Sequence, residues 1–146
     1  MFILPKRIIR RVFIHCSASD RPEHDDVKVM REWHLARGFN DVGYHFFIKK
    51  NGALQTGRPI ELVPAAQQGH NTGTIAICLH GLVAANFTLE QFATLKKLCR
   101  EINDAALKAF RPITFHGHRE VAAKECPVFD YRSVIGLTKD GFLIGQ

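Results

Sequence analysis

The sequence predicts an α/β or α+β domain in which a central mixed sheet of about five strands is flanked by helices. Two observations indicate this fold: short apolar runs of strand length alternate with helical patterns, and an Asn-Gly pair joins two of these runs. Of the 146 residues, 46% are hydrophobic and 23% are charged, which is enough for one core. We therefore expect a single domain over residues 1–146.

The first half of the chain predicts a strand, a helix and a hairpin. Residues 11–15 read R-V-F-I-H, a β-branched and aromatic run typical of a buried strand, and His15 ends it. A polar loop follows, and then a helix is expected to about residue 37, with an aspartate available as its cap. Residues 42–56 are expected to form two strands joined at the Asn-Gly pair.

The second half predicts two strands and two helices. The apolar run at 74–79 is expected to be a central strand covered on both faces. From residue 88 a capping box, T-x-x-Q, precedes apolar residues spaced by three and four, which predicts a long amphipathic helix to about residue 107. A last strand is expected at 113–115, and a closing helix at 130–137.

Composition limits the location and the partners. No apolar run approaches the ~18 to 20 residues of a membrane span, and the N-terminus lacks the order of a secretory signal. We therefore expect a cytoplasmic protein with its four cysteines reduced. The formal charge of +6 favours an acidic partner, such as nucleic acid, an anionic membrane surface or a carboxylate-bearing polymer.

Reactive side chains are densest in the stretch His116–Cys126, which reads H-G-H-R-E-V-A-A-K-E-C. Zn²⁺ binds imidazole nitrogen and thiolate sulfur, and catalytic sites use three protein ligands. This stretch can supply two ligands, with His116 and His118 as alternatives, so a third must come from elsewhere. His15 also ends a predicted strand, and ligands of such sheets tend to bind beyond strand ends.

Other chemistries fit parts of the same stretch. A nucleophilic Cys-His pair and a histidine-rich nuclease site both remain open at this point. A purely structural zinc site would have four protein ligands and commonly carries C-x-x-C pairs, which this chain lacks. Cys78 and Cys99 lie on apolar segments and are expected to be small buried hydrophobic residues.

Four segments of the chain, in order and in register, resemble a known family. They read F-I-H-C-S-A-S, D-V-G-Y-H-F-F-I-K-K-N-G, T-I-A-I-C-L-H-G and H-R-E-V-A-A-K-E-C-P. This pattern is similar to that of the zinc N-acetylmuramoyl-L-alanine amidases, and most of all to the small phage endolysins called lysozymes. Bacterial recycling amidases and animal peptidoglycan-recognition proteins are more distant relatives. The resemblance covers about residues 12–130.

Carried over by position, the resemblance implies the site residues. His15, His118 and Cys126 match the zinc ligands, so His118 is selected over the neighbouring histidine. Tyr44 matches the catalytic tyrosine and Lys124 the catalytic lysine. One Zn²⁺ is therefore expected in each chain.

The chain departs from the family pattern in one loop. Where the family usually has G-x-H-A, this chain reads A-A-Q-Q-G-H-N. His70 and Asn71 are the residues expected to replace part of that contact with the substrate.

The resemblance implies a zinc hydrolase that cleaves the amide between N-acetylmuramic acid and L-alanine in peptidoglycan, as a phage or prophage endolysin in host-cell lysis. With no signal, the protein would need a holin-like pore to leave the host cytoplasm. A monomer that binds muropeptide is expected; binding to a phage RNA polymerase, known for some relatives, is left open. The alternatives are a non-catalytic peptidoglycan-binding module and a cytoplasmic nucleic-acid-binding protein or nuclease.

Overall fold

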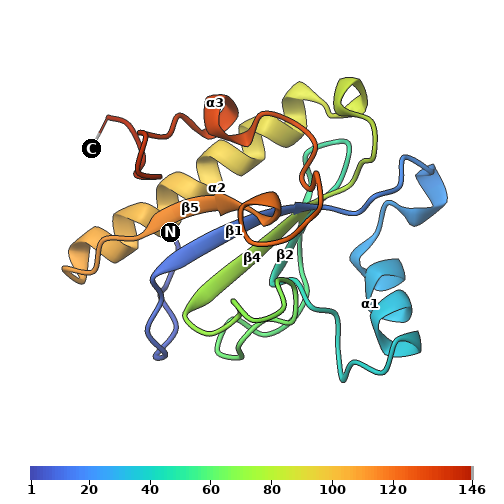
Figure 1. Ribbon diagram of the computed structural model, residues 1–146, viewed down its shortest axis with the longest axis horizontal. Helices are drawn as coiled ribbons and strands as arrows, with labels where there is room; N and C mark the ends of the chain where they lie inside the picture. Colours follow the sequence, from blue (N-terminus) through green and yellow to red (C-terminus); the bar gives the residue numbers. More distant parts are fainter. Residues whose placement is uncertain (146) are drawn as a thin grey trace.

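A five-stranded mixed sheet lies at the centre of the computed structural model, which describes residues 1–145 (Figure 1). The strand order is β3-β2-β4-β1-β5, and only β3 runs antiparallel to its neighbour. The strands are β1 (Arg11–Cys16), β2 (Phe46–Ile48), β3 (Leu54–Thr56), β4 (Thr74–Leu79) and β5 (Thr114–Gly117). The mixed sheet of five strands in a single α/β domain confirms the predicted fold class.

Helices cover both faces of this sheet. The long α2 and the short α3 pack on one face, and α1 lies on the other (Figure 1). In the described part of the chain three 3₁₀ turns follow β1, β4 and β5, and no helix has both the length and the apolar character of a membrane span. The helices are α1 (Val27–Ala36), α2 (Leu89–Lys108) and α3 (Tyr131–Ile135), and the turns are η1 (Pro22–His24), η2 (Ala84–Asn86) and η3 (His118–Glu120).

Each helix begins at a side chain that caps it. Asp26 accepts a backbone N–H of the first turn of α1, and Asp130 does the same for α3. The capping box predicted for α2 is present: Thr88 accepts the backbone N–H of Gln91, whose side chain accepts that of Thr88. Because these caps satisfy N–H groups that have no partner within the helix, they fix where each helix starts.

The hairpin differs from the prediction at its first strand. The predicted strand starts at residue 42, whereas β2 begins only at Phe46. The strand starts later because of a tertiary contact: Gly43 donates its N–H to the side chain of His34 on α1 instead of to a neighbouring strand. The segment before β2 is therefore drawn towards α1, and this places Tyr44 near the edge of the sheet.

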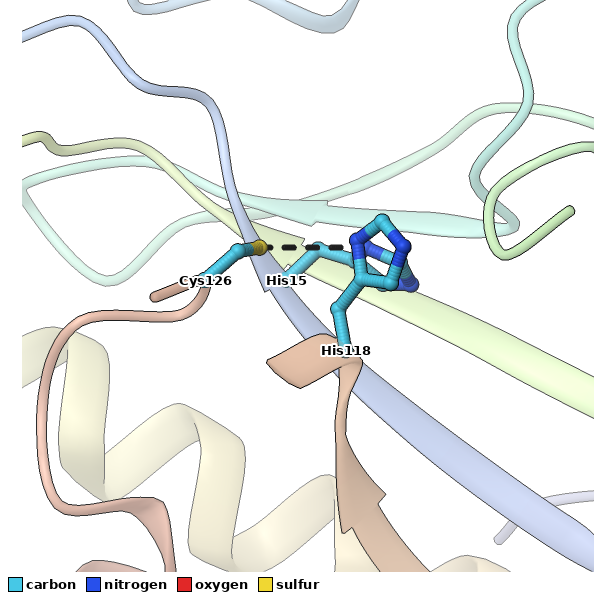
Figure 2. A group of neighbouring side chains, drawn as sticks. All are labelled: His15, His118 and Cys126. Atoms are coloured by element: carbon cyan, nitrogen blue, oxygen red, sulfur yellow. Dashed lines mark hydrogen bonds between the residues drawn. The ribbon is translucent and has the colours of Figure 1, made fainter. Parts of the chain in front are cut away.

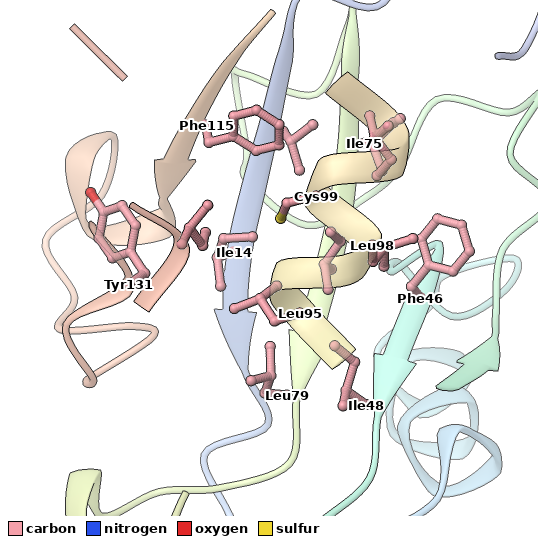
Figure 3. Close-up of a cluster of buried hydrophobic side chains, with 14 of the residues drawn as sticks. Ile14, Phe46, Ile48, Ile75, Leu79, Leu95, Leu98, Cys99, Phe115 and Tyr131 are labelled. Carbon is pink, nitrogen blue, oxygen red and sulfur yellow. The ribbon is translucent and has the colours of Figure 1, made fainter. Parts of the chain in front are cut away.

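The main hydrophobic core lies between α2 and the sheet (Figure 3). Leu95, Leu98 and Cys99 of α2 pack over β1 and its neighbours, where Ile14 and Leu79 are completely buried. A smaller apolar cluster under α1 contains Val27, Met30, Val42, Phe47 and Cys78. The two clusters thus cover both faces of the strands whose ends carry the site residues.

Replacing Leu95 with alanine should lower the free energy of unfolding by about 2–5 kcal/mol, because the side chain is 0% exposed and its loss leaves a cavity. Leu89, on the same helix, is 82% exposed and provides the matched control. Its replacement with alanine should change stability by no more than about 0.5 kcal/mol. Urea unfolding of both variants measures the difference; equal losses would contradict this packing.

Candidate metal centre

Parallel pairing of β1 with β5 brings two histidines together. Ile14 of β1 lies opposite Gly117 of β5, so the next residues, His15 and His118, follow side by side. Their ring centroids are 4.6 Å apart. Because the carboxyl ends of parallel strands meet at one edge of a sheet, residues 103 positions apart in sequence can share one site.

The loop after η3 returns to place Cys126 against the same edge. Arg119 of η3 donates its backbone N–H to the carbonyl of Cys126 at 2.8 Å, which closes the loop. The backbone N–H of Cys16, just after His15, donates to Cys126 Sγ at 3.2 Å. A donor aimed at sulfur stabilises negative charge on it, so this contact opposes part of the rise in thiol pKa that the other neighbours of Cys126 cause.

His15, His118 and Cys126 form a compact set of ligand atoms (Figure 2). One atom from each residue lies within 4.8 Å of the other two, and Cys126 Sγ is 3.9 Å from His15 Nδ1. Bonds of ~2.0–2.3 Å in tetrahedral geometry would place such atoms about 3.3–3.8 Å apart. A small contraction of the cluster would therefore hold one metal ion.

The charge states of this cluster also fit a metal. Burial lowers the pKa of His15 to about 3, with a smaller contribution from His118, and burial also lowers the pKa of His118. Both rings are therefore neutral at pH 7, the form that offers a lone pair to a metal. Hydrogen bonding with the Cys16 side chain and burial raise the pKa of the Cys126 thiol, so a bound cation would have to displace its proton.

The three ligand residues line a cavity of about 1170 Å³ that extends from the sheet edge to α1. Tyr44 and Lys124, the two catalytic candidates, line the same cavity. The Tyr44 ring lies 5.2 Å from that of His15, whereas the exposed Lys124 lies in the loop that carries Cys126. The structure thus brings all five predicted residues to one cavity.

Two neutral histidines hold the segment that carries Tyr44. Gly43 donates its N–H to His34 Nδ1 at 2.7 Å. Ala76 donates its N–H to His45 Nδ1 at 3.1 Å, so His45 Nε2–H is left to donate to a loop carbonyl. Burial lowers the pKa of both imidazoles to about 4, and each is neutral at pH 7.

These histidines should make the protein less stable in acid. In the unfolded chain they take up protons near pH 6.5, whereas in the folded protein His34 and His45 do so only near pH 4. Between these values the unfolded state binds more protons, so the free energy of unfolding falls as the pH falls from about 6.5 to 4. Urea unfolding at several pH values measures this slope. His45→Gln should make it shallower, and an unchanged slope would contradict the role of His45.

Both ring nitrogens of His116 have partners outside the metal cluster. Its Nδ1 lies 2.8 Å from Glu120 Oε1 and its Nε2 lies 2.6 Å from the Thr114 hydroxyl. The other oxygen of Glu120 accepts the Gly117 N–H at 2.9 Å and the hydroxyl of Tyr131. Glu120 thus fastens the turn that presents His118. No motif predicts this role of Glu120, because the contact forms only where β5 turns into η3.

Of the two residues predicted to contact substrate in the loop that departs from the family pattern, only one lines the cavity. Asn71 lines it, and the Asn71 Oδ1 accepts the backbone N–H groups of Ala66 and Gln67. His70 is not among the described residues that line the cavity, and its carbonyl accepts a hydrogen bond from the Gln67 side chain. Substrate contacts by His70 and Asn71 stay a prediction.

An α/β fold with two neutral imidazoles and one thiol facing a cavity defines a candidate metalloenzyme, because catalytic zinc sites use three protein ligands. The chain belongs to the N-acetylmuramoyl-L-alanine amidase family, whose sequence model matches residues 5–129.

Known relatives agree with this assignment. The endolysin of Escherichia phage T7 is 35% identical over an alignment of 127 positions, which covers 83% of this chain and 82% of that protein. The endolysin of Enterobacteria phage T3 is 34% identical over 88% of this chain and 86% of its own length. Among solved structures, the amidase LysC from Clostridium intestinale superposes with a TM-score of 0.78 at 25% identity, covering 89% of this chain and 85% of LysC. The chain is an amidase of the phage endolysin type.

Proposed function

We propose that this amidase binds one Zn²⁺ through His15, His118 and Cys126 and hydrolyses the amide between N-acetylmuramic acid and L-alanine in peptidoglycan. The observation that carries the proposal is the set of three ligand atoms, within 4.8 Å of one another, at the wall of a large cavity. Three protein ligands, as opposed to four, are typical of a catalytic zinc site. When bound, Zn²⁺ would supply a Lewis acid that polarises the scissile carbonyl and activates water.

Tyr44 is suited to donate a hydrogen bond in this reaction. Burial raises the pKa of its hydroxyl, so the group keeps its proton at neutral pH. A protonated phenol beside His15 can orient the attacking water or supply a proton in the transition state. Removing the hydroxyl alone should therefore slow the reaction without removing a metal ligand.

Lys124 is suited to stabilise negative charge. Its side chain is exposed and lines the cavity, two residues before Cys126. When the amide carbonyl is attacked, charge develops on its oxygen, and an ammonium group placed there lowers the barrier. The two residues thus have different roles in the same step: Tyr44 orients the water or transfers a proton, and Lys124 stabilises the oxyanion.

The biological role that follows is lysis of a bacterial host at the end of phage growth. The two relatives from phages T7 and T3 are both named endolysins. Peptidoglycan or its muropeptide fragments would be the partner, bound by a monomer that acts on the wall after release from the host cytoplasm.

Purified peptidoglycan distinguishes this function from its alternatives. The amidase should release free L-alanine amino termini without new reducing sugar ends, lose this activity when chelated and regain it with Zn²⁺. A pure binding module would sediment with the wall and release nothing. A nuclease would cut DNA in a metal-dependent way and leave the wall intact. Either of these last two results would reject the proposal.

A further inference from the structure

A completely buried glutamine lies directly against the metal cluster. Gln67 is 0% exposed, and its Oε1 lies 2.9 Å from His15 Nε2. It belongs to the A-A-Q-Q stretch, where the chain departs from the G-x-H-A pattern of the family. A long polar side chain is costly to bury unless all its hydrogen bonds are made, so its partners are informative.

The orientation of the Gln67 amide follows from its neighbours. Thr74 Oγ1 donates to the carbonyl of Asn71 at 2.8 Å, so this hydroxyl is free only to accept from Gln67, at 2.7 Å. The carbonyl of His70, at 3.3 Å, can also only accept. The group that faces both must be the NH₂ of the amide, and its oxygen therefore faces His15.

This orientation decides which nitrogen of His15 carries the proton. An amide oxygen only accepts, so His15 Nε2 must donate and must bear the hydrogen. His15 Nδ1 is then unprotonated, and it is the nitrogen that lies 3.9 Å from Cys126 Sγ. We propose that Gln67 is a positioning residue that fixes His15 in the Nε2–H tautomer and so aims the Nδ1 lone pair at the metal position.

The groups that hold Gln67 are themselves tied to the sheet by hydrogen bonds. The backbone N–H of Gln67 donates to Asn71 Oδ1 at 2.9 Å, and Thr74 begins the central strand β4, opposite Arg11 of β1. The hydrogen bonds thus connect β4 through the Gln67 side chain to His15 near the end of β1. In metal sites generally, a partner on the second ring nitrogen sets the tautomer and the ring orientation of a histidine ligand.

The test compares two substitutions at this position. Gln67→Leu removes the acceptor while keeping most of the volume, and it should weaken zinc affinity by 10–100-fold, the usual effect of losing such a partner. Gln67→Glu keeps an oxygen acceptor for His15 but loses the donor to Thr74 and His70, so its zinc affinity should lie between that of Gln67→Leu and that of the original protein. Competition with a chromophoric chelator measures affinity in the whole protein. Thr72→Leu, at an exposed residue of the same loop that is not among the described residues lining the cavity, is the control and should bind zinc as the original protein does.

This inference rests on the proposed zinc site. A second measurement therefore tests the role of Gln67 independently of zinc binding. Long-range ¹⁵N–¹H NMR of the zinc-free protein reads the His15 tautomer directly, and should show Nε2–H in the original protein and lose this preference in Gln67→Leu. If no variant binds zinc, the metal proposal fails but the tautomer still tests Gln67. An Nδ1–H tautomer in the original protein would overturn the inference, as would equal zinc affinity in Gln67→Leu. Equal losses in the Leu and Glu variants would also overturn it.

Discussion

His118→Ala should lower zinc affinity by more than about 100-fold and abolish measurable amidase turnover. The reason is that loss of an outer partner alone costs 10–100-fold, and loss of a direct ligand must cost more. His118 presents its ring to His15 at 4.6 Å between centroids, within the set of three ligand residues. Zinc content after gel filtration and affinity by chelator competition measure the loss.

His116 provides the matched control for this change. It lies two residues away, but its ring nitrogens face Glu120 and Thr114. His116→Ala should therefore weaken zinc binding much less than His118→Ala, through a looser η3 turn only. Were the order reversed, with zinc lost from His116→Ala and kept by His118→Ala, the ligand assignment would be wrong.

Lys124→Ala should lower kcat by about 10²–10³-fold, the range seen when one group that stabilises an oxyanion is removed. Tyr44→Phe should lower kcat by about 10²–10⁴-fold, the range for a side chain positioned for proton transfer. Neither side chain is among the three ligand residues, so zinc content should stay at one per chain. Turnover on purified peptidoglycan, measured together with zinc content, separates a catalytic loss from a loss of metal.

Lys97→Ala is the control for the removal of a positive charge. Lys97 is exposed on α2, on the face of the sheet opposite α1, and its loss should leave kcat unchanged. If Lys124→Ala behaves like Lys97→Ala, Lys124 has no part in the chemistry. If Tyr44→Phe keeps full turnover, the Tyr44 hydroxyl is likewise excluded, and the ring only packs against His15.

Much of the fold could be predicted because its elements have local signals. The apolar run at 74–79 became β4 without a change of bounds, and the T-x-x-Q capping box fixed the start of α2. The start of β2 could not be predicted in this way. Val42 reads as strand locally, yet the next N–H is taken by His34, a partner nine residues earlier on another element.

In the candidate site, too, residues in local motifs could be predicted, whereas a residue placed by a tertiary contact could not. His15, His118 and Cys126 were implied by short motifs that the family keeps, and the fold brings their ligand atoms within 4.8 Å. Gln67 had no such motif, because its contact with His15 spans 52 positions and exists only once β1 and β4 have paired. The only sequence signal was the departure of its loop from the family pattern.

The central claim is that one Zn²⁺ is held by two imidazoles and one thiolate. Zinc K-edge X-ray absorption of the reconstituted protein tests it most directly. The account predicts one sulfur at ~2.3 Å and two imidazole nitrogens at ~2.0–2.1 Å, completed by one further light atom. In Cys126→Ser the sulfur contribution should disappear. A zinc shell without sulfur in the original protein, or one that keeps its sulfur in Cys126→Ser, would contradict the account.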